Sequence, residues 1–210
     1  MKNTQRLLSL ALSILFLLTL SLGLQSCSQS ETKTEEAKTD AKAEEKTNEN
    51  KEAENEKNTE QKAELKEIKI KDTYSLSIFD YMTENKDLND NASFQYSNNK
   101  KELYLIVIDE SKEELESQGY NLKKYFEFAS DNVVKGVKDG KAAEPEKLQI
   151  KNYETLQGTV TGKFNNIAVT YLLTIVKTDK QYYQILAWTL TSNKSGIADL
   201  KTMINSFKEL

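Results

Sequence analysis

The sequence predicts an α+β fold for residues 67–210, with helices packed on an antiparallel sheet that includes a C-terminal three-stranded meander. Three observations lead to this fold class. Several short segments have alternating or continuous apolar residues, as strands do. Two longer segments have apolar residues three and four positions apart, as amphipathic helices do. The order of strands, helix, strands and helix then favours helices lying on an antiparallel sheet.

Three strands are predicted before the first helix. Tyr74–Ile78 and Ser93–Ser97 alternate between apolar and polar residues, which indicates strands with one buried face. The polar segment Asp87–Asn91 is the loop between them, and Ser97–Lys100 is a turn. Glu102–Asp109 carries a continuous apolar run, which is typical of a strand covered on both faces.

The first helix is predicted to begin after Asn121, because asparagine is a favourable N-cap residue. It is expected to end near Asp139-Gly140, and Pro145, the only proline, marks the loop that follows. Its apolar stripe consists of Leu122, Phe126, Ala129 and Val133, with Tyr125 beside it.

The meander is the strongest local signal in the chain. Glu154–Lys163 and Ile167–Lys177 are separated by Asn165-Asn166, and asparagine tolerates the left-handed backbone that a tight hairpin needs. A second turn at Asp179-Lys180 leads into a third strand, Gln181–Thr191. These three strands are therefore expected to pair in sequence order.

A second amphipathic helix is predicted after the meander, with Ser195 as its candidate cap. Its apolar residues recur at helical spacing and should pack on the sheet. They are Ile197, Leu200, Met203, Ile204 and Phe207.

The order of elements and the segment GTVTGKFNNIAVTYLLTIVKTDKQYYQILAWT, followed by a terminal helix, resemble the PsbP-like fold, an α/β/α sandwich. That group includes the photosystem II extrinsic subunit, Ran-binding Mog-type proteins and many small bacterial lipoproteins. The resemblance covers most of residues 67–210. It implies an auxiliary or binding role.

The N-terminal residues 1–26 have the layout of a secretory signal. Lys2 and Arg6 precede the apolar run Leu7–Leu24. The motif Leu24-Gln25-Ser26-Cys27 resembles the lipobox of bacterial lipoproteins, which implies that Cys27 carries lipid and becomes the first residue of the mature protein. An uncleaved anchor and a soluble secreted protein are the alternatives. Ser28, rather than aspartate, follows the cysteine, and by resemblance to enteric-type sorting this implies the outer membrane in a cell that has one.

Residues 27–66 are predicted to be the lipidated cysteine followed by a disordered charged linker. The segment from Ser28 to Lys66 is rich in Glu, Lys, Thr, Ala and Asn and has no aromatic residue, so it has little apolar surface to bury. A charged helix is the alternative. Like charges recur four residues apart, which disfavours a stable helix.

The composition of the mature chain excludes several kinds of chemistry. The sequence has no histidine, its only cysteine is Cys27, and its only arginine is Arg6 in the signal. Ser-His and Cys-His nucleophile pairs, imidazole or thiolate metal sites and an internal disulfide are therefore not expected. No cofactor and no metal are predicted. The near-neutral charge of residues 67–210 without arginine argues against nucleic-acid binding.

Three short patterns are those of penicillin-recognising serine enzymes: Ser97–Lys100, Ser130-Asp131-Asn132 and Lys177-Thr178. In such enzymes the first pattern opens a helix, and here it is predicted to lie in a turn between strands. The second falls inside the first predicted helix, and the third lacks its glycine. We interpret all three as coincidental.

Two other patterns also have simpler interpretations. Asp87, Asn89 and Asn91 have the spacing of a calcium loop, but Ala92 and Asn98 replace the glycine and glutamate that the loop needs. A polar turn is the better interpretation. The acid pairs Asp109-Glu110 and Glu113-Glu114 are those a glycosidase could use, but neighbours in sequence do not face each other across a substrate bond.

Tyr182 and Trp188 are the candidate residues for a binding surface. Both lie on the last strand of the meander and share its parity, so they point to the same face. Packing against a helix is the other interpretation. Tyrosine and tryptophan favour interfaces because their rings are apolar and carry a polar atom.

The sequence therefore predicts a membrane-anchored lipoprotein of the cell envelope with a non-catalytic binding or accessory domain. Its expected partners are the membrane, through the lipid on Cys27, and an envelope protein. A hydrolase that uses carboxylates or a Ser/Lys pair is one alternative, and a structural spacer without a specific ligand is the other.

Overall fold

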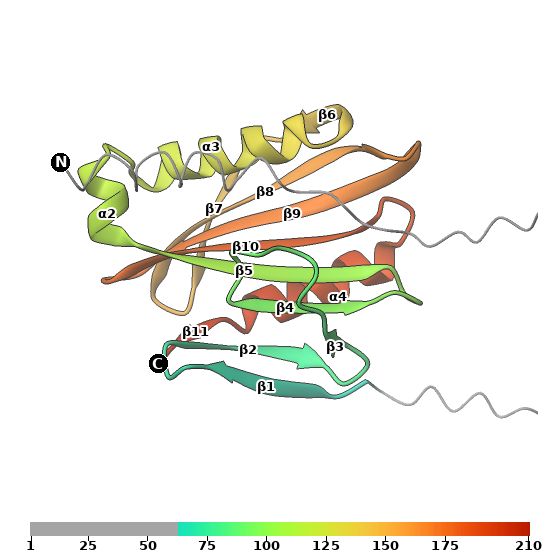
Figure 1. Ribbon diagram of the computed structural model, residues 1–210, viewed down its shortest axis with the longest axis horizontal. Helices are drawn as coiled ribbons and strands as arrows, with labels where there is room; N and C mark the ends of the chain where they lie inside the picture. The colour runs from blue at the N-terminus through green and yellow to red at the C-terminus, as the bar shows by residue number, and fades with distance from the viewer. Residues whose placement is uncertain (1–62) are drawn as a thin grey trace, which may run out of the picture. The chain divides into compact units, whose positions relative to one another are not determined.

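Two antiparallel sheets organise residues 63–210, which are the part of the chain that the computed structural model describes (Figure 1). In the larger sheet the strand order is β3-β4-β5-β10-β9-β8-β6, with β7 also paired to β8. Its strands are β3 (Thr83–Glu84), β4 (Phe94–Asn98), β5 (Leu103–Ser111), β6 (Lys138–Ala142), β7 (Glu146–Ile150), β8 (Tyr153–Phe164), β9 (Ile167–Lys177) and β10 (Gln181–Leu190). The smaller sheet has the order β1-β2-β11. Its strands are β1 (Leu65–Ile70), β2 (Tyr74–Phe79) and β11 (Lys208–Glu209).

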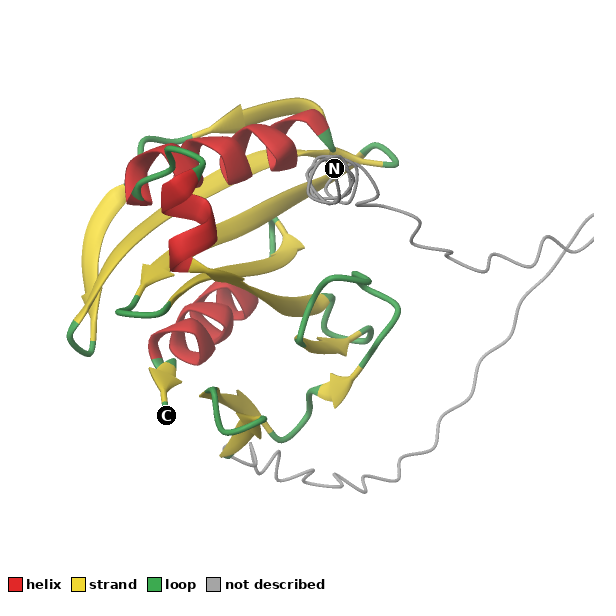
Figure 2. Cartoon of the chain, turned by 60° about the vertical axis from the view of Figure 1, so that its left-hand side comes forward, coloured by secondary structure: helices red, strands yellow, loops and turns green. Residues whose placement is uncertain are grey.

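Helices cover both faces of the larger sheet (Figure 2). On one face α3 (Leu122–Lys135) packs over β6, β8 and β9, and the short α2 (Lys112–Ser117) packs on β5 and β10. On the other face α4 (Lys194–Asn205) packs against β10, β5 and the strand β2 of the smaller sheet. The described residues thus form the α+β layers that the sequence predicts. None of their helices is both long and apolar enough to cross a bilayer.

Strand β5 separates two apolar clusters, as its continuous apolar run predicts. Leu105 and Val107 face the cluster under α4, whereas Tyr104 and Ile106 face the cluster under α3. All four side chains are buried. Burial of apolar surface on both faces is the main source of stability in such a sheet.

The meander forms with the predicted strand order and the predicted turn at Asn165-Asn166. Phe164 pairs with Ile167 across the first turn, and the two turn residues, Asn165 and Asn166, have φ angles of 48° and 65°. Positive φ at both central residues is the geometry of a type I′ hairpin turn, which asparagine tolerates. Strand β10 then pairs with β9 from Tyr182 to Leu190.

Asn121 caps α3 as predicted, because its side-chain oxygen accepts a hydrogen bond of 3.0 Å from the N–H of Lys124. The predicted end of this helix near Asp139-Gly140 is wrong. The helix ends at Lys135, and residues 138–142 form β6. Gly140 passes so close to the carbonyl of Val134 that no Cβ fits there, so the chain turns back onto the helix at this glycine.

The predicted cap of the last helix is also wrong. Asn193, rather than Ser195, precedes α4, and its side-chain oxygen accepts a bond of 2.9 Å from the N–H of Gly196. Phe207 is buried but lies beyond the end of the helix, in the connection to β11. Strand β1 begins at Leu65, ahead of the expected domain start at Glu67. Residues 27–62 of the predicted linker, with Cys27, and the predicted signal at residues 1–26 lie outside the described residues.

Candidate functional site

Tyr182 and Trp188 point to the same face of β10, as their parity predicts, and both belong to the cluster under α3. Tyr182 is fully buried and Trp188 is 9% exposed. Tyr183, their neighbour on the strand, points to the opposite face and is also buried. The structure therefore places both candidate residues among packed side chains, and neither ring lies open to solvent.

Trp188 is the centre of a stack of three aromatic rings. Its cross-strand neighbours are Tyr104 on β5 and Tyr171 on β9. The centroid of the Trp188 ring lies 5.2 Å from that of Tyr104, with the planes 9° apart, and 5.8 Å from that of Tyr171, with the planes 28° apart. Burial raises the pKa of both tyrosines to about 12. The hydroxyls of Tyr104 and Tyr171 therefore remain protonated at neutral pH. We name Tyr104, Tyr171 and Trp188 the aromatic stack.

Tyr182 belongs to a second group on the same face, the tyrosine–carboxylate cluster, which consists of Glu110, Glu116, Tyr125, Lys177 and Tyr182. The hydroxyl of Tyr125 donates to the carboxylate of Glu110. The hydroxyl of Tyr182 lies 3.3 Å from Oε1 of Glu116, and the same oxygen lies 2.9 Å from Nζ of Lys177. The rings of Tyr125 and Tyr182 meet edge to face, with centroids 5.5 Å apart. These contacts join α2 and α3 to the sheet.

The two glutamates of this cluster have opposite electrostatic environments. Burial raises the pKa of Glu110, and the hydrogen bond from Tyr125 offsets part of this effect. The hydrogen bond from Lys177 lowers the pKa of Glu116, which lies at the surface. Burial also raises the pKa of Tyr125 and of Tyr182. The tyrosines therefore act as hydrogen-bond donors at neutral pH and not as bases.

Asp109, next to Glu110 on β5, points to the opposite face of the sheet. Its carboxylate accepts a hydrogen bond from the hydroxyl of Ser93, and Oγ of Ser93 lies 2.7 Å from the hydroxyl of Tyr74. Asp109 and Glu110 therefore lie on different sides of one strand. They cannot flank a common substrate bond, as the two carboxylates of a glycosidase do.

The enzyme-like patterns are not brought together. Ser97 lies on β4 and bonds to the side chain of Asn85, Ser130 is buried on α3, and Lys177 ends β9 and pairs with Glu116. They therefore lie on different elements and have different partners.

The predicted polar turn at Asp87–Asn91 is confirmed as a loop. The side chain of Asn85 accepts from the N–H of Asp87, and the side chain of Asn89 accepts from the N–H of Asn91. Oε1 of Gln95 accepts from two further loop N–H groups. Side-chain oxygens here hold the backbone of the loop. Within residues 63–210 there is no group of three acidic, histidine or cysteine side chains that could hold a metal ion.

A surface group that the sequence analysis did not identify lies where β1 begins. We name Leu65, Phe79, Tyr81 and Lys101 the Leu65 patch. Leu65 is 46% exposed and lies opposite Phe79 in the β1–β2 register. The rings of Phe79 and Tyr81 stack with centroids 5.2 Å apart, and Nζ of Lys101 lies 4.6 Å from the centroid of Tyr81. No local pattern indicates it in sequence, because the patch joins three segments and the alternation of Tyr74, Leu76 and Ile78 marks the opposite face of the strand.

No protein-family model matches this sequence, and no curated protein matches it. Solved structures do match its fold. The solution structure of PsbP (CyanoP) from Synechocystis sp. PCC 6803 is 14% identical with a TM-score of 0.52, and the match covers 70% of this chain and 94% of that one.

Two further structures are more distant. LpqN, described as involved in cell envelope biogenesis of Mycobacterium tuberculosis, is 12% identical with a TM-score of 0.48, covering 70% of this chain and 91% of that one. A Bacteroides thetaiotaomicron protein is 10% identical with a TM-score of 0.45, and the match covers 65% of this chain but only 45% of that longer one. The likeness to PsbP, together with the layers and the meander, shows that residues 63–210 have the PsbP-like fold that the sequence resemblance predicts.

Proposed function

We propose that the protein is a lipoprotein of the bacterial cell envelope, anchored through lipid on Cys27, whose PsbP-like domain is a non-catalytic binding or accessory module. The motif Leu24-Gln25-Ser26-Cys27 at the end of an apolar run carries the anchoring part of this proposal. Several acyl chains on one cysteine would give firm attachment, since a single chain binds a membrane only marginally. Ser28 after the cysteine favours the outer membrane in a cell that has one.

The contacts of the acidic residues support the non-catalytic part. Asp109 and Glu110 point to opposite faces and each accepts a hydrogen bond from a nearby hydroxyl, on Ser93 and Tyr125 respectively. Glu116 is paired with Lys177. These bonds tie elements of the fold together, which is the usual role of satisfied polar networks in a packed domain.

Tyr182 and Trp188 are packed inside the domain, which favours a role of both rings in the fold. The surface that an accessory module presents to its partner must therefore lie among exposed side chains. The Leu65 patch combines an exposed leucine, two stacked aromatic rings and a lysine, and such groups are typical of contact surfaces.

The experiment that tests the proposal compares the natural protein with Cys27→Ala. We expect radiolabelled palmitate on the natural chain, recovery of that chain in the membrane fraction, and loss of both in the variant. Crosslinking in cells followed by pull-down should then recover an envelope protein with the lipidated chain and not with Cys27→Ala. Equal fractionation of the two forms would reject the lipid anchor.

A further inference from the structure

We propose that the Leu65 patch lies against the lipid headgroup layer of the bilayer that holds the protein, so that one end of the domain consistently faces the membrane. This inference rests on the proposed lipid anchor at Cys27. It adds an orientation and a lipid contact to an anchor that by itself fixes neither.

The first observation is the place of the patch in the fold. The described chain enters the domain at the patch, where the N–H of Asp80 donates a hydrogen bond of 2.8 Å to the carbonyl of Glu64. Any tether between Cys27 and Leu65 therefore leaves the domain beside the patch. The disordered linker that the sequence predicts would have a root-mean-square span of about 30–35 Å over residues 28–62, from ~5–6 Å times the square root of the residue number.

That span makes even a weak contact effective. A flexible tether of this kind keeps its attached module at an effective concentration in the millimolar range near the other end. A patch with millimolar affinity for lipid would be occupied about half of the time under this tether. The contact therefore does not need the area of a stable protein interface.

The second observation is the chemistry of the patch. Leu65 is exposed, and the rings of Phe79 and Tyr81 are half-buried beside it. Aromatic rings with a polar group favour the boundary between hydrocarbon and water, and a lysine beside them can extend its ammonium group towards phosphate. Lys101 already lies over the Tyr81 ring and can supply that charge.

The charges around the patch are mixed. Lys100 and Lys194 are exposed near Lys101, because the side chain of Asn193 donates to the carbonyl of Lys101 and holds the two loops together. Asp80 is exposed beside Tyr81, and the hydroxyl of Tyr81 donates to Asp199 over 2.7 Å. A surface with both signs suits a headgroup layer that also carries both signs. We therefore expect the contact to depend only weakly on salt.

The third observation is the distribution of exposed apolar residues. The larger exposed ones in residues 63–210 are Leu65 at 46%, Ile167 at 50% and Leu210 at 45%. Figure 1 places the start of β1 and the β8–β9 turn that carries Ile167 at the same end of the domain. The N–H of Thr191, on the loop that precedes Asn193, bonds to Ala168 beside Ile167. Leu210 lies at the opposite end.

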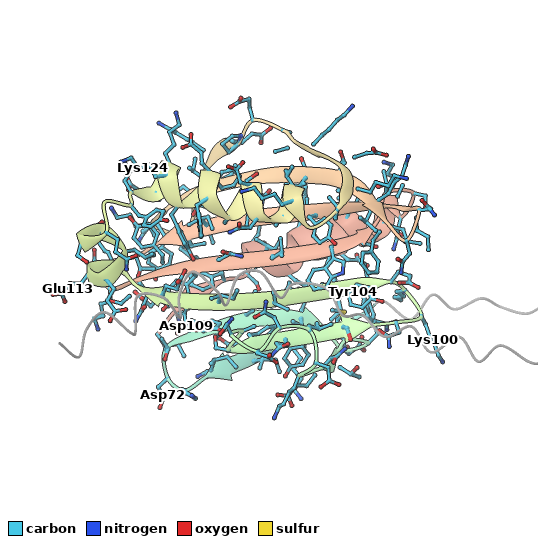
Figure 3. All side chains as sticks on the ribbon, turned by 45° about the horizontal axis from the view of Figure 1, so that its top comes forward. Asp72, Lys100, Tyr104, Asp109, Glu113 and Lys124 are labelled. Carbon is cyan, nitrogen blue, oxygen red and sulfur yellow. The ribbon has the colours of Figure 1, made fainter. Side chains whose placement is uncertain are left out.

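Figure 3 shows which labelled side chains lie at each of these two ends. Lys100 extends from the end that carries the patch, whereas Asp72 and Glu113 lie at the other end. A domain that rests on lipid through the Leu65 patch therefore points Asp72, Glu113 and Leu210 away from the membrane. That far end is then the part available to a partner in the envelope.

The test uses the full lipidated protein in phospholipid vesicles, with one added cysteine that carries a nitroxide spin label. Cys27 is the only natural cysteine, and once it is acylated the added thiol is the only one that reacts. Leu65→Cys reports on the patch, Ile167→Cys reports on the same end, and Leu210→Cys is the matched control of equal exposure. Collision of the label with oxygen, which is enriched in lipid, is compared with collision with a water-soluble nickel complex.

We expect the labels at positions 65 and 167 to gain oxygen collisions and lose nickel collisions on transfer from detergent to vesicles, while the label at 210 keeps its nickel collisions. Adding Leu65→Glu to the Ile167→Cys protein should restore nickel collisions at position 167. Equal collision rates at 65 and 210 in vesicles would overturn the inference.

The failures of the two proposals are distinguishable. If the labelled protein does not float with the vesicles, the lipid anchor itself is rejected. If it floats but the label at 65 stays fully accessible to nickel, the anchor stands and only the lipid contact of the patch is rejected. The same holds if protection at 65 requires other membrane proteins, because the patch would then face a protein. Near-ultraviolet circular dichroism of each variant confirms that it is folded before it is scored.

Discussion

The hydroxyl of Tyr125 on α3 donates a hydrogen bond to the carboxylate of Glu110 on β5. Helix α3 otherwise packs mainly over β6, β8 and β9, so this bond reaches across the sheet to a more distant strand. Tyr125 is buried, and burial raises the pKa of Glu110. The pair therefore joins helix and strand through polar atoms that have little access to water.

We expect Tyr125→Phe to destabilise the domain by about 1–3 kcal/mol, because it leaves the half-buried carboxylate of Glu110 without its donor. Urea unfolding followed by circular dichroism measures the loss. Tyr120→Phe is the matched control, since Tyr120 contacts the Tyr125 ring edge to face and keeps that contact without its hydroxyl. Equal losses in the two variants would mean that the Tyr125 hydroxyl is not the source of the effect.

The stability of the domain should also depend on pH through Glu110. Because its pKa is raised in the folded state, its stabilising contribution is fully present below the unfolded pKa of a glutamate and is lost as the pH rises through the folded pKa. We expect Glu110→Gln to remove this decline. The check is unfolding free energy against pH for both proteins. Parallel curves above the unfolded pKa would contradict the expectation.

Glu116 must be measured separately, because its contribution has the opposite sign. The hydrogen bond from Lys177 lowers its pKa, so its contribution is present above the unfolded pKa and is lost as the pH falls through the folded pKa. Glu116→Gln therefore affects the acidic limb of the curve, and Glu110→Gln affects the limb at higher pH.

The loss of unfolding free energy should differ between variants of the two helix caps, Asn121 and Asn193. Asn121→Ala should cost about 1 kcal/mol, as is usual for loss of an N-cap. Asn193→Ala should cost more, because that side chain also donates to the carbonyl of Lys101 and to the hydroxyl of Thr189. Thermal and urea unfolding of the two variants decide the order. A larger loss for Asn121→Ala would contradict the assigned role of Asn193.

Trp188, the only tryptophan, should report on the packing of the aromatic stack. With 9% exposure and a tyrosine ring on each side, its emission should be blue-shifted and poorly quenched by acrylamide. Unfolding in urea should shift the emission towards that of free tryptophan in water. A red-shifted, readily quenched emission in the native protein would show that the stack is open to solvent.

Much of the fold could be predicted because its long elements are periodic. The runs that became β5, β9 and β10 are apolar and continuous, and the stripe of α3 follows helical spacing. The strands that were missed are short or polar. β6 and β7 owe their pairing to the exposed edge of β8, and nothing within their own residues specifies that partner.

Two missed elements did carry a local signal. Ser111 precedes Glu114 by three residues, which is a helix-start pattern, and its hydroxyl accepts a bond from that residue's N–H over 3.3 Å. The alternation in β1 is obscured by the charged composition that continues from the preceding segment. The cap pattern at Ser111 and Glu114 therefore predicts α2 if helices as short as six residues are considered.

The clusters around the candidate residues were less predictable than the strand that carries them. Period-two alternation was enough to place Tyr182 and Trp188 on one face. Their partners come from far along the chain, as with Glu116, which lies 66 positions before Tyr182. A single sequence holds no record of such long-range contacts. Burial of these rings could therefore be judged only from the packed structure.

The closure of the smaller sheet has a consequence for the speed of folding. Ser206, just before β11, accepts a hydrogen bond from the N–H of Ser77 on β2, and these residues are 129 positions apart. Contacts of such long separation form slowly, because a large loop must close before any bond is gained. We therefore expect the β1–β2 hairpin to gain its last partner after the meander has folded. Lys66 and Lys69 lie on β1, which stays an edge strand in the order β1-β2-β11, and their charges disfavour pairing with a strand of a neighbouring chain.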